Sequence, residues 1–353
     1  MDTSTPASYR QIARMAGVSN FSVSCAMRNR PGVSGPTRTR IREIARKLGY
    51  TPNPMVTALM EHQRRGRRES LRSIIACLRG FPPAVEKLIA QNEKIHSTLA
   101  EPFTGAKEAG ARHGFLLELF RFDEFREKPE RFFRILQAKS VSGIILQGVD
   151  LPETWVGAKG WDNYSLAAAG NRRIDLPCDF ACGDNHRNMW TLLTHLGELG
   201  YQHVGLTFLE NSKSGWMERD LHRHLSACLG WHARTGRPSP SVLFTSEWSR
   251  AQLVRWVKRN RLDVFVAIDR IPLEMLLESG LRVPEDIGFA HLDLDRSWDD
   301  IAGMRTNNHQ VGAVAAQLVI EQINRNARGI PEHPRAIFLH GEWFPGPTVR
   351  NIL

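Results

Sequence analysis

The side chains with the clearest capacity for chemistry are the basic residues gathered near the N-terminus. The 353-residue chain carries a formal net charge of +10, from 47 Lys and Arg against 37 Asp and Glu. Residues 1–72 hold 14 of these basic and 4 of these acidic side chains, and residues 73–353 balance at 33 and 33. Clustered cations neutralise phosphates, so the pattern favours a nucleic acid as partner. A basic surface that is merely solvated is the alternative.

The elements that would carry this charge are three short helices. Ser8 and Gln11 have the spacing of a capping box at the start of the first helix. Gly17 suits the following turn, and Ser19 and Ser34 are expected to cap the second and third helices. The apolar positions of the shared seam are Ile12, Ala13, Ala16, Val18, Val23, Ala26, Met27, Ile41, Ile44, Ala45 and Leu48. This arrangement predicts a helix-turn-helix domain.

A short hinge helix is expected to follow. Asn53 is a good N-cap and Pro54 suits the first helical position, but a helix ending near Glu61 is too short to be stable alone in water. Such a helix would couple DNA binding to the state of the next domain. The basic run 64–68 after it is a solvated linker in one interpretation and an extra phosphate contact in the other.

Together these segments resemble the LacI/GalR family of bacterial transcription regulators. The matching residues are Ile12-Ala13, Ala16 to Ser19, Val23-Ser24, Val33-Ser34, Thr37-Arg38 and Gly49-Tyr50 with Pro52-Asn53. The resemblance implies a homodimer that places two recognition helices in adjacent major grooves of a pseudo-palindromic operator. It also implies paired hinge helices in the minor groove, with Leu59 as the wedge that opens the central base step.

The resemblance identifies the residues that would contact DNA. Asn20 suits an adenine edge, Phe21 suits a thymine methyl, and Cys25 replaces a common arginine that grips guanine. A small filler without DNA contact is the alternative for Cys25, and Arg28 stands where the family usually has asparagine, so we expect an unusual operator. The full predicted set is Ser19, Asn20, Phe21, Ser22, Ser24, Cys25, Arg28, Ser34, Arg38, Asn53, Met55, Ala58 and Leu59. Of these, Ser19, Ser22, Ser24, Ser34 and Arg38 are expected to position the headpiece on phosphates.

The composition of the chain limits the class of protein to which it can belong. An apolar content of 42 %, without an apolar leader or an apolar run of 18 residues, indicates a globular cytoplasmic protein. The length fits a headpiece plus a larger two-lobed unit. The five cysteines, at positions 25, 77, 178, 182 and 228, lack metal-like spacing, so we expect reduced thiols and neither metal nor other cofactor.

The larger unit shows strands alternating with amphipathic helices, which predicts α/β lobes with doubly wound parallel sheets. The expected strands are 73–78, 116–120, 143–147, 164–169, 204–208, 264–268 and 288–292. The expected helices are 103–113, 129–139, 185–199, 218–234, 249–260 and 272–279. Ligands of such sheets bind outside the carboxyl ends of the strands.

The family resemblance extends loosely over this unit, through Asp184-Asn185, 283–289, 307–312 and 341–350. It implies a periplasmic-binding-protein-like pair of lobes joined by three crossovers. The predicted domains are a headpiece at 1–52, a hinge helix and basic linker at 53–70, and an effector-binding and dimerisation domain at 71–353. Lobe 1 would comprise about 71–183 and 307–336, and lobe 2 about 184–306 and 337–353.

The resemblance implies that three residues, Asn171, Arg219 and Asp293, stand at positions that line the family's effector pocket. An arginine and an aspartate facing a cleft suit polyol hydroxyls, so a sugar is the first candidate effector. The alternatives are a structural ion pair across the cleft and a pocket that needs no small ligand.

The function expected from these features is an effector-controlled, sequence-specific DNA-binding regulator, a repressor rather than an activator, acting as a dimer. An enzyme fused to a DNA-binding headpiece is the second hypothesis, because Asp293, Asp295, Asp299 and Asp300 could be imagined as a metal site. A solvated acidic loop is the favoured interpretation of that cluster, since no metalloprotease, phosphate-loop or nucleophile-elbow motif accompanies it. An architectural DNA binder would spread positive charge over the whole chain, which residues 73–353 do not.

Overall fold

The computed structural model describes residues 9–27, 32–48, 50, 73–81, 86–87, 97–170, 176–209, 216–294 and 296–353. Three helices form the N-terminal headpiece: α1 (Tyr9–Ala16), α2 (Asn20–Met27) and α3 (Gly35–Lys47). Ile12, Val23 and Ile41 are fully buried, one from each helix, and form the centre of a small apolar core. The predicted helix-turn-helix headpiece is therefore confirmed.

The turn between α1 and α2 follows the predicted chemistry. Gly17 has a φ of +63°, where a Cβ would be strained. The backbone N–H of Ser22 donates to the Ser19 hydroxyl at 3.0 Å, so Ser19 caps α2. The predicted Ser34 cap is wrong in its detail: Ser34 holds the N-cap position of α3, but its hydroxyl bonds the Thr37 hydroxyl at 2.8 Å instead of a backbone N–H. The Ser8–Gln11 capping box depends on Ser8, which lies outside the described residues.

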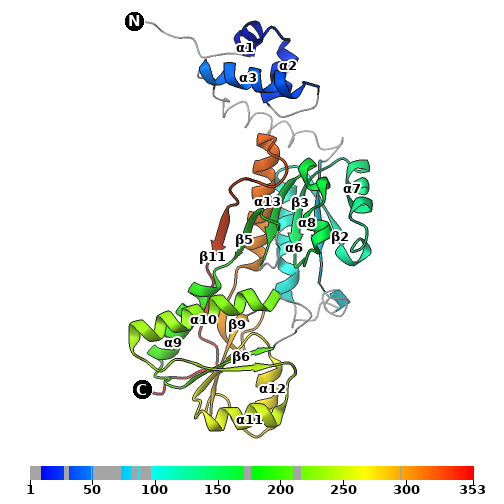
Figure 1. Cartoon of the computed structure of the whole chain (residues 1–353). Helices are drawn as coiled ribbons and strands as arrows, with labels where there is room; N and C mark the ends of the chain where they lie inside the picture. The colour runs from blue at the N-terminus through cyan, green and yellow to red at the C-terminus, as the bar shows by residue number, and fades with distance from the viewer. Residues whose placement is uncertain are drawn as a thin grey trace, which may run out of the picture.

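Lobe 1 is built on a parallel sheet whose described strands run in the order β11-β5-β4-β3-β1-β2. Their bounds are β1 Ser73–Arg79, β2 Phe115–Arg121, β3 Val141–Gln147, β4 Ser165–Ala169, β5 Asp179–Gly183 and β11 Ala336–Leu339. The helical elements are α6 Ser97–Arg112, η2 Phe122–Glu124, α7 Pro129–Ala138, α8 Glu153–Val156, η3 Lys159–Asn163 and α13 Asn308–Arg325. In Figure 1, α6 and α13 cover one face of this sheet and α7 lies on the other side.

The alternation of side chains along each strand explains these layers. In β1, Ile75 and Cys77 pack in the cluster under α6 and α13, whereas Ala76 and Leu78 pack with the aromatic residues of α7 and α8. Both sets are buried, so the strands read as continuous apolar runs. Helices α6 and α13 approach very closely, because a Cβ on Gly312 would stand 1.7 Å from the carbonyl oxygen of Pro102.

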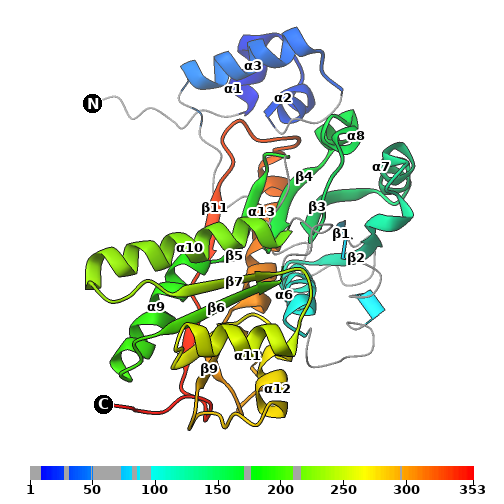
Figure 2. The same ribbon diagram turned by 60° about the horizontal axis from the view of Figure 1, so that its bottom comes forward.

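Lobe 2 repeats the plan with described strands in the order β12-β10-β9-β8-β6-β7, where β12 is antiparallel to β10. The strands are β6 Val204–Leu209, β7 Ser241–Thr245, β8 Val264–Ala267, β9 Gly288–Leu294, β10 Ala302–Arg305 and β12 Glu342–Phe344. The helices are α9 Asn185–Glu198, α10 Trp216–Thr235, α11 Arg250–Arg259 and α12 Ile271–Glu278. Figure 2 shows α10 on one side of β6 and β7, with α11 and α12 on the other. The predicted two-lobed α/β fold with parallel sheets is confirmed.

The chain passes between the two sheets at three described points: from β5 to α9, from β10 to α13, and from β11 to β12. The predicted lobe boundary at 336/337 falls inside β11, which pairs along its length with β5 of lobe 1. The crossing therefore lies near 340. The prediction missed it because β11, although apolar in sequence, has only four residues, which is the lower limit for recognising a strand from its pattern.

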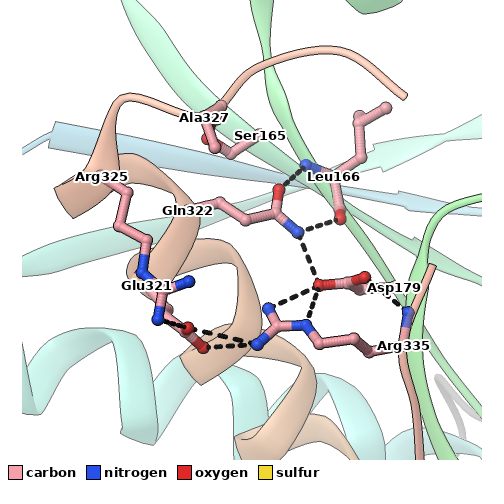
Figure 3. Close-up of polar contacts among 8 residues, drawn as sticks. All are labelled: Ser165, Leu166, Asp179, Glu321, Gln322, Arg325, Ala327 and Arg335. Atoms are coloured by element: carbon pink, nitrogen blue, oxygen red, sulfur yellow. Dashed lines mark hydrogen bonds and ion pairs between the residues drawn. The ribbon is translucent and has the colours of Figure 1, made fainter. Parts of the chain in front are cut away.

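A buried carboxylate fastens the late segment of lobe 1 to the early one (Figure 3). Asp179, 2 % exposed at the start of β5, accepts hydrogen bonds from Arg335 N, Nε and Nη2 at 2.8, 3.0 and 2.6 Å. It also accepts from Gln322 Nε2 of α13 at 3.1 Å. Gln322 is itself bonded to both backbone groups of Leu166 in β4, at 2.7 and 2.9 Å. Glu321 completes the cluster by pairing with Arg335 at 3.2 Å.

Replacing Asp179 with Ala is expected to lower the free energy of unfolding by about 3 kcal/mol, because the substitution strands donors that are buried around the carboxylate. This is the lower end of the usual range, since Arg335 is 45 % exposed and regains water when its partner is removed. Urea denaturation followed by circular dichroism measures the change. Glu332→Ala, at an exposed position, serves as the control, and a loss of less than about 0.5 kcal/mol in Asp179→Ala would contradict the role of this cluster.

Candidate DNA interface and effector site

Helix α2 presents its polar N-terminal end to solvent. Asn20 is exposed and Phe21 is 72 % exposed, whereas Val23 and Ala26 are buried against α1 and α3. Asn20 and Phe21, which the sequence predicts to read bases, are therefore available to a partner.

The predicted phosphate contacts lie in two places: Ser19, Ser22 and Ser24 at or within α2, and Ser34 and Arg38 at the start of α3. Ser19 and Ser34 are exposed, while Ser22, Ser24 and Arg38 are half-buried. The Ser19 and Ser22 hydroxyls lie 3.0 Å apart. Arg38 Nη2 donates to the carbonyl of Val33 at 3.5 Å, which fixes the guanidinium beside the start of α3.

Two further arginines have a structural role that the sequence did not indicate. Arg40 Nη2 donates to the carbonyl of Ala16 at 2.7 Å, and Arg42 Nε donates to the carbonyl of Ala26 at 3.3 Å. Each guanidinium satisfies a carbonyl in the last turn of α1 or α2. Part of the positive charge of the headpiece therefore holds its helices together.

Cys25 is placed differently from the expected base-reading position. Its side chain is 3 % exposed, so the thiol faces the protein interior. This burial favours the alternative interpretation, a small filler between helices, over a base contact. Arg28, Asn53, Met55, Ala58 and Leu59 lie outside the described residues, as does the basic run 64–68.

The three crossings bring the carboxyl ends of strands from both sheets together. β5 and β11 of lobe 1 and β10 of lobe 2 all end there. His340 Nε2 lies 3.4 Å from Asp184 Oδ2, and Asn307 Nδ2 donates to the carbonyl of His340 at 2.6 Å. The carboxyl edges of two parallel sheets thus meet where ligands of such sheets bind.

Asp293, a predicted effector residue, lies at this edge near the end of β9. Its carboxylate accepts hydrogen bonds from the Thr306 hydroxyl and from Asn308 Nδ2, the latter at 3.1 Å, so the chain leaving β10 holds it. Arg219 lies in the first turn of α10, and its side chain is not described. Asn171 lies outside the described residues. The structure therefore brings Asp293 to the crossings without bringing the three residues together.

The acidic cluster that could be imagined as a metal site contains aspartates that pair with arginines of the protein itself. Asp299 pairs with Arg305 at 2.6 Å and Asp300 pairs with Arg270 at 2.8 Å, while Asp295 is not described. Across the described residues, no group of His, Cys, Asp or Glu has the arrangement of a metal site.

Polar residues at the carboxyl edges that sequence reasoning missed include a buried ion pair and a buried amide. Arg79, which ends β1, donates to both carboxylate oxygens of Glu86 at 2.7 and 2.6 Å. Gln147, which ends β3, is 2 % exposed and donates to the carbonyl of Leu99 at 2.8 Å. Polar residues directly after apolar strand runs were the available signal. From lobe 2, Arg223 of α10 reaches Cys182 Sγ of lobe 1 at 3.6 Å.

Comparison with known proteins shows which family shares this sequence and architecture. Residues 9–53 match the family described as bacterial regulatory proteins, lacI family. The HTH-type transcriptional repressor CytR of Escherichia coli strain K12 is 25 % identical over 334 residues, which cover 90 % of each chain. The HTH-type transcriptional repressor PurR of Aliivibrio fischeri is 22 % identical over 351 residues, covering 94 % of this chain and 95 % of that one.

Solved structures with the same fold span the whole chain. A CelR–cellobiose complex superimposes with a TM-score of 0.57 at 18 % identity, covering 97 % of this chain and 99 % of that one. A lac repressor dimer bound to operator superimposes with a TM-score of 0.56 at 16 % identity, covering 98 % and 99 %.

The chain belongs to the lacI family.

Membership confirms the expectation of a DNA-binding transcriptional regulator rather than an enzyme. Among the described residues of this lacI-family chain, no helix combines the length and apolar character needed to cross a membrane.

Two histidines of lobe 2 are buried and held neutral. His224 of α10 is 3 % exposed and stacks on Phe208 near the end of β6, with ring centroids 6.0 Å apart. Burial, aided by the neighbouring Arg223, lowers the pKa of His224 to about 4. Burial, aided by the charge of Arg270, also lowers the pKa of His291 to about 4. The ring of His291 accepts a hydrogen bond from the backbone N–H of Asp293 at 3.1 Å, as a neutral imidazole can.

These depressed pKa values predict acid sensitivity. The unfolded chain binds a proton at each histidine below a pKa of about 6.5, whereas the folded protein resists protonation down to about 4. Their stabilising contribution is therefore complete above pH 6.5 and is lost as the pH falls toward 4. Between pH 7.5 and pH 5.0, the free energy of unfolding should fall by about 2 kcal/mol less in His224→Phe than in the wild type. Urea denaturation at the two pH values measures it. His222→Gln, at an exposed position, should keep the wild-type dependence; equal losses in all three proteins would contradict the prediction.

Proposed function

We propose that this protein is a homodimeric repressor that binds a pseudo-palindromic operator and responds to a small molecule held between its lobes. The observation that carries the proposal is the exposed Asn20–Phe21 pair at the capped end of α2. That end belongs to the segment 1–72, which holds the entire +10 excess charge. Residues 73–353 are neutral, so they suit a regulatory body rather than a DNA-coating surface.

In this proposal Asn20 pairs with an adenine edge and Phe21 packs on a thymine methyl. Ser19, Ser22, Ser24, Ser34 and Arg38 hold the headpiece on phosphates and carry no sequence information. Arg28 and the hinge residues Asn53, Met55, Ala58 and Leu59 complete the interface. Cys25 contributes packing instead of base contact, because it is buried.

The geometry of DNA and the relatives support a dimer. One headpiece covers a half-site, and two related half-sites about one helical turn apart require two headpieces. The lac repressor, whose fold this chain shares, is a dimer on its operator in the solved complex. A palindromic site would then mirror the twofold axis of the protein.

A sugar or another polyol is the proposed effector class. Relatives of the same fold have been solved with cellobiose, sucrose and D-xylulofuranose. Asn171, Arg219 and Asp293 are the proposed contacts, and of these Asp293 lies at the edge where the lobes meet. A ligand that favours one lobe arrangement changes operator affinity, and linkage requires DNA to change ligand affinity by the same factor.

One observation favours a second candidate, a repressor that needs no small ligand or that depends on a protein co-repressor. The carboxylate of Asp293 is already bonded to Thr306 and Asn308 of the crossing, as a structural residue would be. A ligand would have to compete with these donors. Operator affinity that no polyol changes would favour this second candidate.

Replacing Leu59 with Ala tests the proposed function. The wedge is needed only where the hinge helices open a central base step, so operator affinity should fall at least about tenfold while affinity for a random duplex stays unchanged. Fluorescence anisotropy with both duplexes at the same salt concentration measures the two affinities. Met60→Ala truncates a comparable apolar side chain at the neighbouring position and is the control. Equal losses on both duplexes would contradict a hinge-dependent, sequence-specific regulator.

A further inference from the structure

A cavity lies in lobe 1, away from the crossings. Its volume is about 840 Å³, within the range of small-molecule sites. The walls come from α7, the first residues of β3, the α8–η3 turn and the segment after α13. Because β3 and β4 begin beside it, with Val141 and Tyr164 in its lining, the cavity marks the amino edge of the sheet. The candidate effector site lies at the opposite, carboxyl edge.

The charge of this cavity is predominantly positive. Arg134 of α7, Lys159 of η3 and Arg328 after α13 all line it. In the described part of the chain, none of the three has an ion pair with a carboxylate. Elsewhere in the same lobe Arg79, Arg126 and Arg335 are each paired with an acidic residue. Glu130 is the acidic residue of the lining, which leaves an excess of two positive charges.

The remaining lining suits a ligand with a carbon skeleton. The rings of Phe133 and Tyr164 are stacked with centroids 6.2 Å apart, and Phe133 packs directly over Gly160, where a Cβ would stand 2.3 Å from the ring. Gln137 and Asn163 add amide groups to the same lining. An apolar wall with a few polar groups and cations around it is the usual composition of a site for a charged metabolite.

We propose that this cavity binds a phosphate group. A phosphate monoester carries about −1.5 to −2 charges at pH 7, which matches the excess of two cations better than the single charge of a carboxylate does. Arginine provides bidentate donors for its oxygens. The same group could come from a free phosphorylated molecule or from the backbone of DNA beside the operator. The position of the cavity suits the second source, because β1 also starts at this edge, at Ser73, and the DNA-binding segment precedes it in the chain.

The test uses the full-length protein and inorganic pyrophosphate as probe, with binding measured by isothermal titration calorimetry at constant ionic strength. The cavity variant is Arg134→Gln with Arg328→Gln. The control is Lys107→Gln with Arg112→Gln, which removes the same charge from exposed positions of α6 outside the cavity. Comparing these two variants cancels any binding of the probe to the basic headpiece. Urea midpoints establish that both variants fold as the wild type does.

A second arm measures affinity for one duplex as a function of salt concentration. Each phosphate contact contributes a little less than one unit to the slope of log affinity against log salt.

Pyrophosphate affinity at least tenfold weaker in the cavity variant than in the control supports the proposal with a free phosphate compound as the source. Unchanged pyrophosphate binding with a slope smaller by about one in the cavity variant supports it with DNA as the source. If the cavity variant and the control variant have the same pyrophosphate affinity and the same salt slope, the proposal is overturned. The pyrophosphate arm does not depend on the proposed function, so its failure and the failure of the regulator proposal are distinguishable.

Discussion

The buried carboxylate of Asp179 is the interaction on which the arrangement of lobe 1 depends. The chain leaves this lobe after β5 and returns for α13 and β11, so two segments far apart in the sequence must be joined inside one sheet. Asp179 joins them by accepting hydrogen bonds from Arg335 and from Gln322, and Gln322 in turn clamps Leu166 of β4. A carboxylate excluded from water holds such donors strongly because each would otherwise remain unsatisfied.

The sheet that Asp179 holds together carries a different feature at each of its two edges. The amino edge carries Ser73, through which the DNA-binding segment joins lobe 1, and the positively charged cavity. The carboxyl edge carries the crossings, where Asp293 and the Asp184–His340 pair lie. The sheet between these edges is buried on both faces, and a closely packed body of this kind moves as a unit. In the proposed function, such a movement couples the effector site to the hinge without direct contact.

Local patterns were sufficient to predict the headpiece and most of the layers. The spacing of Ile12, Val23 and Ile41 predicts three packed helices, and apolar runs such as Ser73–Leu78 predict buried strands. Short strands escaped prediction, as β11 did, because a run of four residues is at the lower limit at which a strand pattern can be recognised, even when all four are apolar. Contacts between distant residues escaped as well: 156 residues separate Asp179 from Arg335. The burial of Cys25 likewise depends on how the helices pack, which spacing along α2 alone does not determine.

Selection of preferred duplexes from a random pool, with the full-length protein, tests the central claim that α2 reads sequence. We expect the wild type to enrich one pseudo-palindrome. Phe21→Ala, which removes an exposed side chain, should enrich a different or relaxed half-site, whereas Cys25→Ala should enrich the same site as the wild type. No enrichment by the wild type, or the same enriched site for Phe21→Ala and a changed one for Cys25→Ala, would contradict it.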